Sequence, residues 1–366
     1  MKKLLLLVLT FCLTSSAFAL NWQSVGARQM AMGGTGVAIA QGLDAQYYNP
    51  ALLTSTKEYE EDIVSNLTFG ALGHFKPSGI TNPKDELYTK YKTKTDADAG
   101  VGFKKGGLTL GVRSLSSLIT ARAGTTQNIN ADLGIFTEVA LGYGFEPIRG
   151  INVGGNIKVI EGIMGEYSHA ASTWGVGFGG LMKELWYTKE YSTSWGIDLG
   201  AAVNLSKLFN ANVLFDPTIA IVGKNLNRPS FKRSKNSHWN EKEYRMDKQV
   251  RIGAAIHPFT DRVTITGDYD LTESNSIVKD YKSRQLSGGI EIMAINRHTF
   301  KLPIRLGVNQ DREDDEIPTY FTAGFGTQNT EYAFDFAVAF SNEADKINAN
   351  YFPTVMGVSM SFTWVF

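Results

Sequence analysis

The chain has 366 residues, of which 43% are hydrophobic and 20% are charged. Lys and Arg together number 36, as do Asp and Glu, so the zero net charge gives no electrostatic argument for a nucleic-acid partner. Gly is abundant at 37 residues and Pro is scarce at 10, which excludes a largely disordered or collagen-like chain. The length allows one large domain or two ordinary ones.

Residues 1–19 have the pattern of a secretory signal peptide. Two lysines precede an apolar run over residues 4–13, and Ala-Phe-Ala at residues 17–19 supplies the small residues of a cleavage site. We therefore expect a mature chain that begins at Leu20; the alternative is an uncleaved anchor helix, for which the run is short. Cys12 is the single cysteine of the chain, so the mature protein is expected to have no disulfide and no cysteine nucleophile.

Alternation with a period of two residues dominates the chain after the signal. Between residues 133 and 145 the odd positions are mostly large and apolar, whereas the even positions are mainly Gly, Ala or Glu. A turn at 146–150 and a second alternating run over 151–159 complete a hairpin pattern. Similar runs predict strands at 63–75, 107–116, 195–204, 217–224, 250–257, 263–271, 284–293, 303–309, 319–327, 332–340 and 358–366. One or two helical turns are expected within 178–190.

The chemistry of the two strand faces favours a membrane barrel over a soluble sandwich, which also alternates. The polar face is rich in Gly, Asn, Asp and Glu, as suits a wet lumen. The last strand places Phe362, Trp364 and Phe366 on one face, and this ending resembles the C-terminal signature that the insertion machinery of bacterial outer membranes recognises. The sequence thus predicts an all-β fold, a transmembrane antiparallel β-barrel of about 14 strands. The alternative is a secreted domain with a buried edge strand.

The strand register and the long polar stretches give further expectations. We expect Phe334 and Phe336 to face lipid, and Glu331 and Asp335 to face the lumen. The long polar stretches are interpreted as outer loops and lie at 76–100, 160–192 and 226–249.

Two charged stretches allow a binding role as well as a solvated loop. The basic residues within 227–248 suit lipopolysaccharide phosphates or an acidic partner, but a solvated loop is the interpretation we favour. The acidic residues within 311–316 have the oxygen ligands that calcium takes, but they lack the glycine spacing of a calcium loop, so a solvated loop is again favoured.

Residues 20–57 stand apart, because they are small and Gly-rich and lack clean alternation, which suits a segment folded inside the barrel mouth. They contain AR-x-x-x-MGG-x-GVA at 27–38 and NPA-x-L at 49–53. With these motifs the chain resembles the FadL/TodX superfamily of outer-membrane proteins, and most closely its branch of conjugal-transfer TraF-like and PorV-like barrels. Weaker similarities extend the resemblance over most of the mature chain and lie at 223–226, 251–253, 289–291 and the strand that contains Asp268.

The resemblance implies 14 strands over residues 58–366 and an N-terminal lumen plug over residues 20–57. It also implies plug or ligand-gating roles for Arg28, Gly33, Gly34, Gly36, Asn49, Pro50 and Ala51. Glycines permit turns without side-chain volume, and a proline restricts the preceding asparagine to extended or turn geometry. The alternative is that the segment is only a structural stopper.

Charged residues inside the predicted lumen need partners. We expect Glu138, Asp268 or Asp270 to pair with Arg28, and we expect these carboxylates and Asp335 to brace the barrel. Asp268 and Asp270 share a strand face and form a candidate acid/base pair, but lumen carboxylates more often have structural roles. Because no catalytic, nucleotide-binding or metal-ligand pattern is present, we expect no enzyme activity, no metal and no cofactor.

Two interpretations of function remain. The FadL resemblance implies passive passage or binding of small hydrophobic molecules through a plugged barrel, although the chain looks shorter than typical fatty-acid transporters of the superfamily. The TraF-like and PorV-like branch implies a non-transporting barrel component of a conjugation or protein-secretion system that binds protein partners. In either case we expect the outer membrane of a Gram-negative cell, contacts with its lipids and lipopolysaccharide, and assembly by the barrel-assembly machinery. No nucleic-acid binding is expected.

Overall fold

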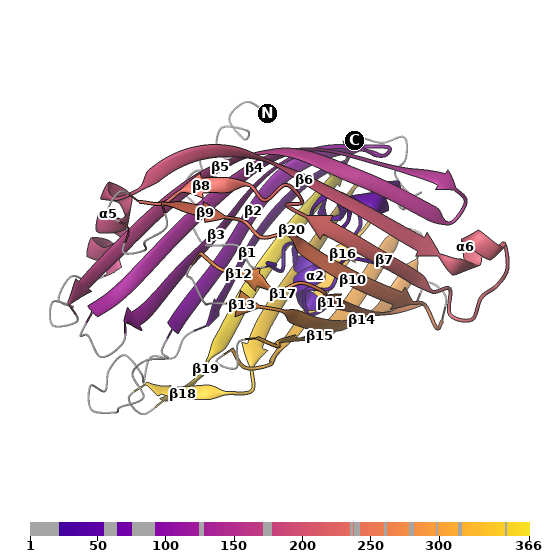
Figure 1. Cartoon of the computed structure of the whole chain (residues 1–366). Helices are drawn as coiled ribbons and strands as arrows, with labels where there is room; N and C mark the ends of the chain where they lie inside the picture. The colour runs from indigo at the N-terminus through magenta and orange to yellow at the C-terminus, as the bar shows by residue number, and fades with distance from the viewer. Residues whose placement is uncertain are drawn as a thin grey trace.

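Fourteen antiparallel strands close into one barrel in the computed structural model (Figure 1), which confirms the predicted fold class. The structure describes residues 22–54, 64–74, 92–123, 128–170, 178–234, 237, 242–259, 262–277, 282–297, 299–313, 317–347 and 350–366. Around the barrel the strands are β1 (Val64–His74), β2 (Lys92–Lys105), β3 (Leu108–Ala123), β4 (Asn128–Ile148), β5 (Ile151–Ala170), β6 (Glu190–Asn204), β7 (Thr218–Lys224), β10 (Gln249–Ile256), β11 (Val263–Asp270), β14 (Gln285–Arg297), β15 (Phe300–Asp311), β16 (Tyr320–Gln328), β17 (Tyr332–Ser341) and β20 (Val355–Val365). Pairing of β20 with β1 closes the barrel, so each of these strands has a neighbour on both sides.

Short helices and hairpins lie at the two ends of the barrel and in its interior. Helices α2 and α3 and the 3₁₀ helix η1 precede the barrel, and they span Ala27–Ala31, Asp44–Tyr48 and Pro50–Thr54. The connections carry α5 (Phe178–Tyr187), α6 (Leu205–Phe209) and three hairpins, β8 (Ser230–Lys232) with β9 (Glu243–Arg245), β12 (Ser274–Asn275) with β13 (Lys282–Ser283), and β18 (Ala344–Ile347) with β19 (Asn350–Pro353). Within the ranges given above, no helix has the length and apolarity needed to cross a membrane.

The two ends of the barrel differ in their connections. At one end, here called the short-turn end, tight turns such as 106–107 and 149–150 join neighbouring strands, and α6 lies at this end in Figure 1. At the other end, the long-loop end, the connections carry α5 and the three hairpins.

The interpretation of 76–100 as an outer loop is wrong for its last residues, because β2 begins at Lys92. The alternation of this strand is weak in sequence because the positions between the inward-facing Lys94, Asp96 and Asp98 are occupied by Thr and Ala rather than by large apolar residues. Inside the lumen, Lys94 pairs with Asp96 at 2.9 Å. The interpretation of 160–192 as a loop is wrong in part for a similar reason, since β5 continues to Ala170. The expected helical turns within that stretch are confirmed as α5.

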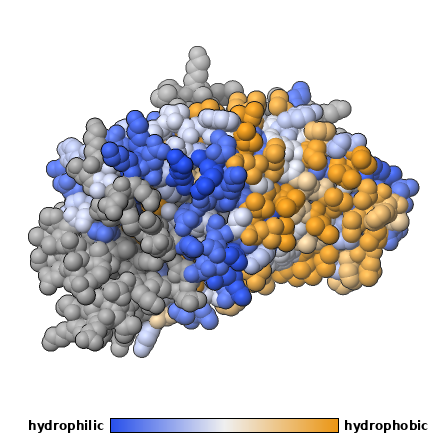
Figure 2. Space-filling view, viewed as in Figure 1, coloured by the Kyte–Doolittle hydropathy of each residue, from blue (hydrophilic) through white to orange (hydrophobic). Residues whose placement is uncertain are grey.

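Side-chain alternation separates a lipid-facing surface from the lumen, as the sequence predicts. In β4, Val139 and Leu141 are 44% and 53% exposed on the outer face. Glu138 and Phe136, at the alternate positions, are 7% and 0% exposed. Figure 2 shows apolar side chains gathered over the part of the barrel toward α6 and hydrophilic ones toward α5. This apolar band is what a β-barrel presents to hydrocarbon.

The register predicted for β17 is confirmed, with one exception. Phe334 packs on Phe362 of the neighbouring strand with ring centroids 4.9 Å apart, while Asp335 points inward and pairs with Arg305 at 2.6 Å. The expectation for Glu331 is wrong, because this residue precedes β17 in an exposed turn.

Spin labels on β20 give a direct test of this orientation. Val358 is 42% exposed on the outer face, and the adjacent Ser359 is 1% exposed inside. In lipid vesicles we expect a nitroxide at Val358→Cys to collide frequently with oxygen, which concentrates in hydrocarbon, and one at Ser359→Cys to collide rarely. Higher oxygen accessibility at position 359 than at 358 would reverse the register and contradict this fold.

Candidate functional site

The N-terminal segment, defined here as residues 22–54, lies inside the barrel. Helix α2 contacts β15, β16, β17 and β20, whereas η1 contacts β4, β5 and β6 on the opposite side of the strand ring. Nearly all of the segment is buried, and only Gln41 is classed as exposed. The segment therefore crosses the lumen from wall to wall, and its role in gating remains a proposal.

Glycines in the wall make room for the backbone of this segment. A Cβ at Gly154 would overlap the carbonyl group of Pro50, and one at Gly200 would overlap the side chain of Asn49. On the opposite wall, a Cβ at Gly307 would overlap the backbone at Gly33. A side chain at any of these wall positions would push the segment away, so the close fit depends on glycine.

Arg28 pairs with Glu291, so the expectation that Glu138, Asp268 or Asp270 would hold it is wrong. Its guanidinium donates to both carboxylate oxygens of Glu291, at 2.8 and 2.9 Å, and to the carbonyl oxygen of Ile39 at 2.9 Å. Arg305 donates to the same carboxylate at 2.6 Å and continues the network to Asp335. Bidentate pairing fixes the orientation of Arg28 as well as its charge.

The three carboxylates expected to hold Arg28 have other partners. Asp268 accepts hydrogen bonds from the backbone N–H groups of Gly36 and Val37, at 2.7 and 3.0 Å, so it also holds the N-terminal segment. Asp270 and Glu138 instead pair with wall cations, Arg251 and Lys158 respectively. The residues of these two ion pairs all come from barrel strands, and the expected role of lumen carboxylates in bracing the barrel stays a prediction.

The glycines of the first motif allow a tight turn against the wall. Gly33 and Gly34 have φ angles of 74° and 86°, a region that residues with a Cβ rarely adopt. The N–H of Gly33 donates to the Thr322 hydroxyl at 2.9 Å, and its carbonyl accepts from the Asn309 amide at 2.9 Å. Gly36 packs against the ring of Tyr48, where a Cβ would overlap the ring.

Asn49 ties the second motif both to the first motif and to the wall. Its amide donates to the carbonyl oxygens of Val37 at 3.0 Å and Ala201 at 3.3 Å, and its own side-chain oxygen accepts from the N–H of Ala51 at 3.0 Å. Asn49 is fully buried, and Pro50 begins η1 directly after it. Asn49 therefore links the second motif to the first motif and to strand β6.

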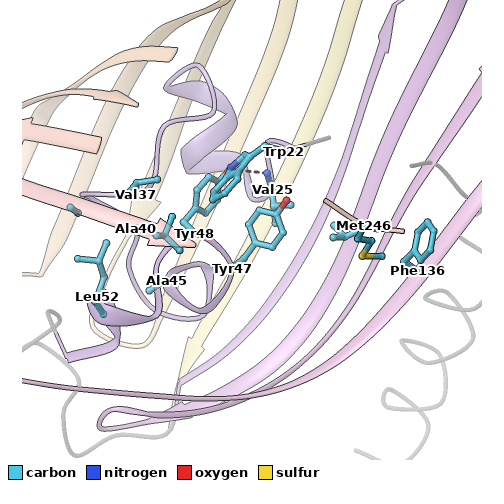
Figure 3. Close-up of a cluster of buried hydrophobic side chains, with 14 of the residues drawn as sticks. Trp22, Val25, Val37, Ala40, Ala45, Tyr47, Tyr48, Leu52, Phe136 and Met246 are labelled. Carbon is cyan, nitrogen blue, oxygen red and sulfur yellow. Dashed lines mark hydrogen bonds between the residues drawn. The ribbon is translucent and has the colours of Figure 1, made fainter. Parts of the chain in front are cut away.

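A cluster of aromatic rings and cations completes the interior, and sequence analysis missed it. The Lys224 ammonium lies 3.2 Å from the ring centre of Tyr47, and the Arg251 guanidinium lies 4.1 Å from that of Trp22. Figure 3 shows Trp22, Tyr47 and Tyr48 packed together, and the rings of Tyr47 and Tyr48 meet edge to face at 5.2 Å. The only signal in the sequence was the weak similarity at 223–226 and 251–253, which carries the two cations.

The stretch interpreted as a solvated outer loop at 227–248 folds partly into the barrel mouth, so this interpretation is wrong for its apolar residues. Phe231, Tyr244 and Met246 are each at most 4% exposed, and Arg233 pairs with Glu166 of β5 at 3.2 Å. The sequence did not predict the burial of these three apolar residues, because they stand among basic residues and do not alternate with polar ones. In the acidic stretch, Asp311 ends β15 and is buried, while 314–316 lie outside the described residues.

The cavities that adjoin the N-terminal segment differ in size. Two cavities beside the N-terminal segment measure about 50 and 30 Å³, and both are smaller than the roughly 150 Å³ cavity that admits benzene. A polar vestibule of about 540 Å³ opens at the short-turn end, with Arg28, Asp44 and Lys104 among its lining residues. In the described part of the chain, no three His, Cys, Asp or Glu side chains are grouped to hold a metal ion.

Comparison with known proteins agrees with this architecture. A solved structure described as the CymD monoaromatic hydrocarbon channel is 15% identical with a TM-score of 0.60, and the alignment covers 96% of this chain and 99% of that one. The Ralstonia pickettii toluene transporter TbuX is 13% identical with a TM-score of 0.56, over 93% and 98% of the two chains. This chain has the fold of the FadL/TodX superfamily. A Pseudomonas aeruginosa FadL homologue is also similar, at 10% identity, a TM-score of 0.53 and coverage of 95% and 99%.

The FadL/TodX fold therefore confirms the predicted resemblance at the level of structure. The sequence model of the family described as the F plasmid transfer operon TraF protein matches residues 137–270, a range that includes the weaker similarities at 223–226 and 251–253 but not the two N-terminal motifs. No curated protein matches the sequence. The first two structures named above are described as a channel and a transporter, and the third is described as a FadL homologue.

Substitution of Arg28 tests the anchor of the N-terminal segment. In Arg28→Gln, Glu291 keeps Arg305 as a partner, so we expect a local effect of about 1–3 kcal/mol, typical of hydrogen bonds to charged groups. Amide exchange within 26–40 should then accelerate by about tenfold to a hundredfold while exchange in the strands stays unchanged. Arg149→Gln, in an exposed turn at the short-turn end, is the control. Equal exchange in both variants would mean that the pair does not hold the segment.

Proposed function

We propose that the protein is an outer-membrane barrel through which small hydrophobic molecules pass when the N-terminal segment shifts. The supporting observation is the segment itself, which crosses the lumen of a barrel whose fold matches hydrocarbon channels over almost the whole chain. Passage would follow the concentration gradient. A ligand that binds the opened arrangement more tightly than the closed one would shift the population toward it.

The present arrangement corresponds to a closed state in this proposal. The cavities beside the segment are too small for an aromatic ring, whereas the vestibule at the short-turn end is already open. Movement of residues 26–44 would join the vestibule to the lumen on the long-loop side, because Arg28 and Asp44 of this range are among the residues that line the vestibule. Discrete polar contacts, rather than a continuous sheet, hold this part of the segment, and such contacts are exchangeable with water.

The proposal includes orientation and partners. Residues 1–19 would direct export and be removed, the short-turn end would face the periplasm, and the long-loop end would face the outside, as is usual for such barrels. Outer-membrane lipids would cover the apolar band, lipopolysaccharide would meet the outer loops, and the barrel-assembly machinery would read Phe362, Trp364 and Phe366. Of these, Trp364 and Phe366 are exposed on the outer side.

A partner-binding role in conjugation or protein secretion is the second candidate. Two observations favour it, namely the TraF match over 137–270 and the small size of the cavities beside the segment. In this case the segment would be a permanent stopper, and the loops would bind protein partners. Transport that requires segment movement distinguishes the two candidates.

A disulfide between the segment and the wall tests the proposal, because the mature chain has no other cysteine. A Cβ at Gly253 would lie 2.8 Å from that of Val37, so a small shift brings Val37→Cys and Gly253→Cys to the roughly 3.5–4.5 Å that a disulfide needs. We expect oxidation to stop uptake of toluene by cells and a reductant to restore it. The single variant Val37→Cys should respond to neither treatment.

Uptake that continues with a fully formed disulfide would refute gating by this segment. Absence of toluene uptake by the native protein, together with a stoichiometric protein partner on gentle purification, would favour the secretion or conjugation role.

A further inference from the structure

The inner wall changes from charged to apolar residues along three neighbouring strands. On β3, β4 and β5 the charged residues Arg113, Glu138 and Lys158 point into the lumen. One inward position further toward the long-loop end, each strand carries an apolar residue instead, and these are Leu115, Phe136 and Ile160, each at most 1% exposed. An apolar strip on a lumen wall has no reason to exist in a water-filled barrel unless something apolar covers it.

The side chain of Phe231 covers this strip. Its ring meets the ring of Phe136 edge to face, with centroids 4.8 Å apart and planes at 71°. On its other side the ring lies directly on Gly162 of β5, where a Cβ would overlap it. Tyr244 and Met246 close the cluster, and Figure 3 shows Met246 beside Phe136.

The hairpin that carries Phe231 does not belong to the strand ladder of the barrel. Among the described residues, strands β8 and β9 pair with each other and form a two-stranded sheet of their own. The described hydrogen bonds from β8 and its flank to the wall include those from the Lys232 N–H to the Ser192 hydroxyl, at 3.0 Å, and from the Ser234 hydroxyl to the Thr188 carbonyl, at 2.6 Å. Together with the Arg233–Glu166 pair, these contacts can break while the ladder of the barrel stays intact.

We propose that the strip formed by Leu115, Phe136, Ile160 and Gly162 is a binding site for one small aromatic ring, which the side chain of Phe231 occupies in this state. The phenylalanine side chain is a toluene-sized group, Gly162 provides a floor without side-chain volume, and Phe136 offers the edge-to-face contact that aromatic pairs favour. This inference rests on the proposed function and adds to it the place and the chemical class of the ligand.

Because Phe231 occupies the strip in this state, the native protein and the variant Phe231→Ala should bind an aromatic ligand differently. In the native chain a ligand must first displace Phe231, so its apparent affinity is reduced by the fraction of molecules in which the hairpin has left the strip. In Phe231→Ala the strip is exposed to a cavity lined by apolar atoms, and cavities of this kind bind benzene. The substitution Phe231→Ala should therefore strengthen binding of a small aromatic molecule rather than weaken it.

The test uses the full mature chain in detergent and fluorobenzene as the probe, followed by ¹⁹F NMR titration. We expect Phe231→Ala to bind one fluorobenzene at least tenfold more tightly than the native protein. Phe259→Ala, at a phenylalanine that is 68% exposed in the turn between β10 and β11, is the matched control and should bind like the native protein. Addition of Gly162→Leu to Phe231→Ala should refill the site and abolish the gain.

Equal affinity of Phe231→Ala and the native protein would overturn the proposal, as would a gain that survives Gly162→Leu. If Phe231→Ala does not fold, amide exchange at 230–234 in the native protein decides, because saturating fluorobenzene should accelerate it at least threefold and an unchanged rate would refute the site. Toluene uptake by the native protein without any binding at this strip would overturn this inference and leave the proposed function standing. Tight binding of fluorobenzene at this strip without toluene uptake by cells would support the site and overturn the proposed function.

Discussion

Charges inside a narrow lumen must be paired, and the interior of this barrel depends on that constraint. An unpaired charge that is removed from water costs several kcal/mol, of the order given for a buried ion after relaxation. Some charges of the wall are paired by other strands, as Lys158 is by Glu138 and Asp198, whereas others take a partner from outside the wall. Glu291 and Arg113 take partners from the N-terminal segment, Arg28 and Asp44, so the segment completes the electrostatics of the wall.

Backbone packing reinforces this arrangement. Wall glycines such as Gly154 and Gly200 let the segment approach until its carbonyl and amide groups touch the strands, and Asn49 then reaches the wall carbonyl of Ala201. Charge pairs set the position, and glycines set how closely the segment fits. An element held in this way is stable when docked, and no strand of the barrel runs through it. The proposed gating also requires that the segment leave the wall as a unit, whereas a permanent stopper requires only the docked arrangement.

The fold was predictable because the bilayer imposes a period of two on every spanning strand. That rule located β4 and β17 and placed Phe334 outside and Asp335 inside. It failed for β2, because the outward positions Thr95 and Ala97 are not large apolar residues. Among the residues of the site, Gly33 and Asn49 could be found, since their motifs are local in sequence. The partner of Arg28 could not, because Glu291 lies 263 residues away and several carboxylates were equally plausible. Phe231 was missed because it stands alone among basic residues.

Conductance in planar bilayers shows whether the docked N-terminal segment closes the lumen. The experiment compares the native mature protein with the variant Arg28→Gln/Asp44→Asn, which removes the Arg28–Glu291 and Asp44–Arg113 contacts between segment and wall. We expect the native protein to stay closed with rare openings and the variant to conduct for most of the time. Sustained conductance of the same size in both proteins would mean that the docked segment leaves an open path and does not close the lumen.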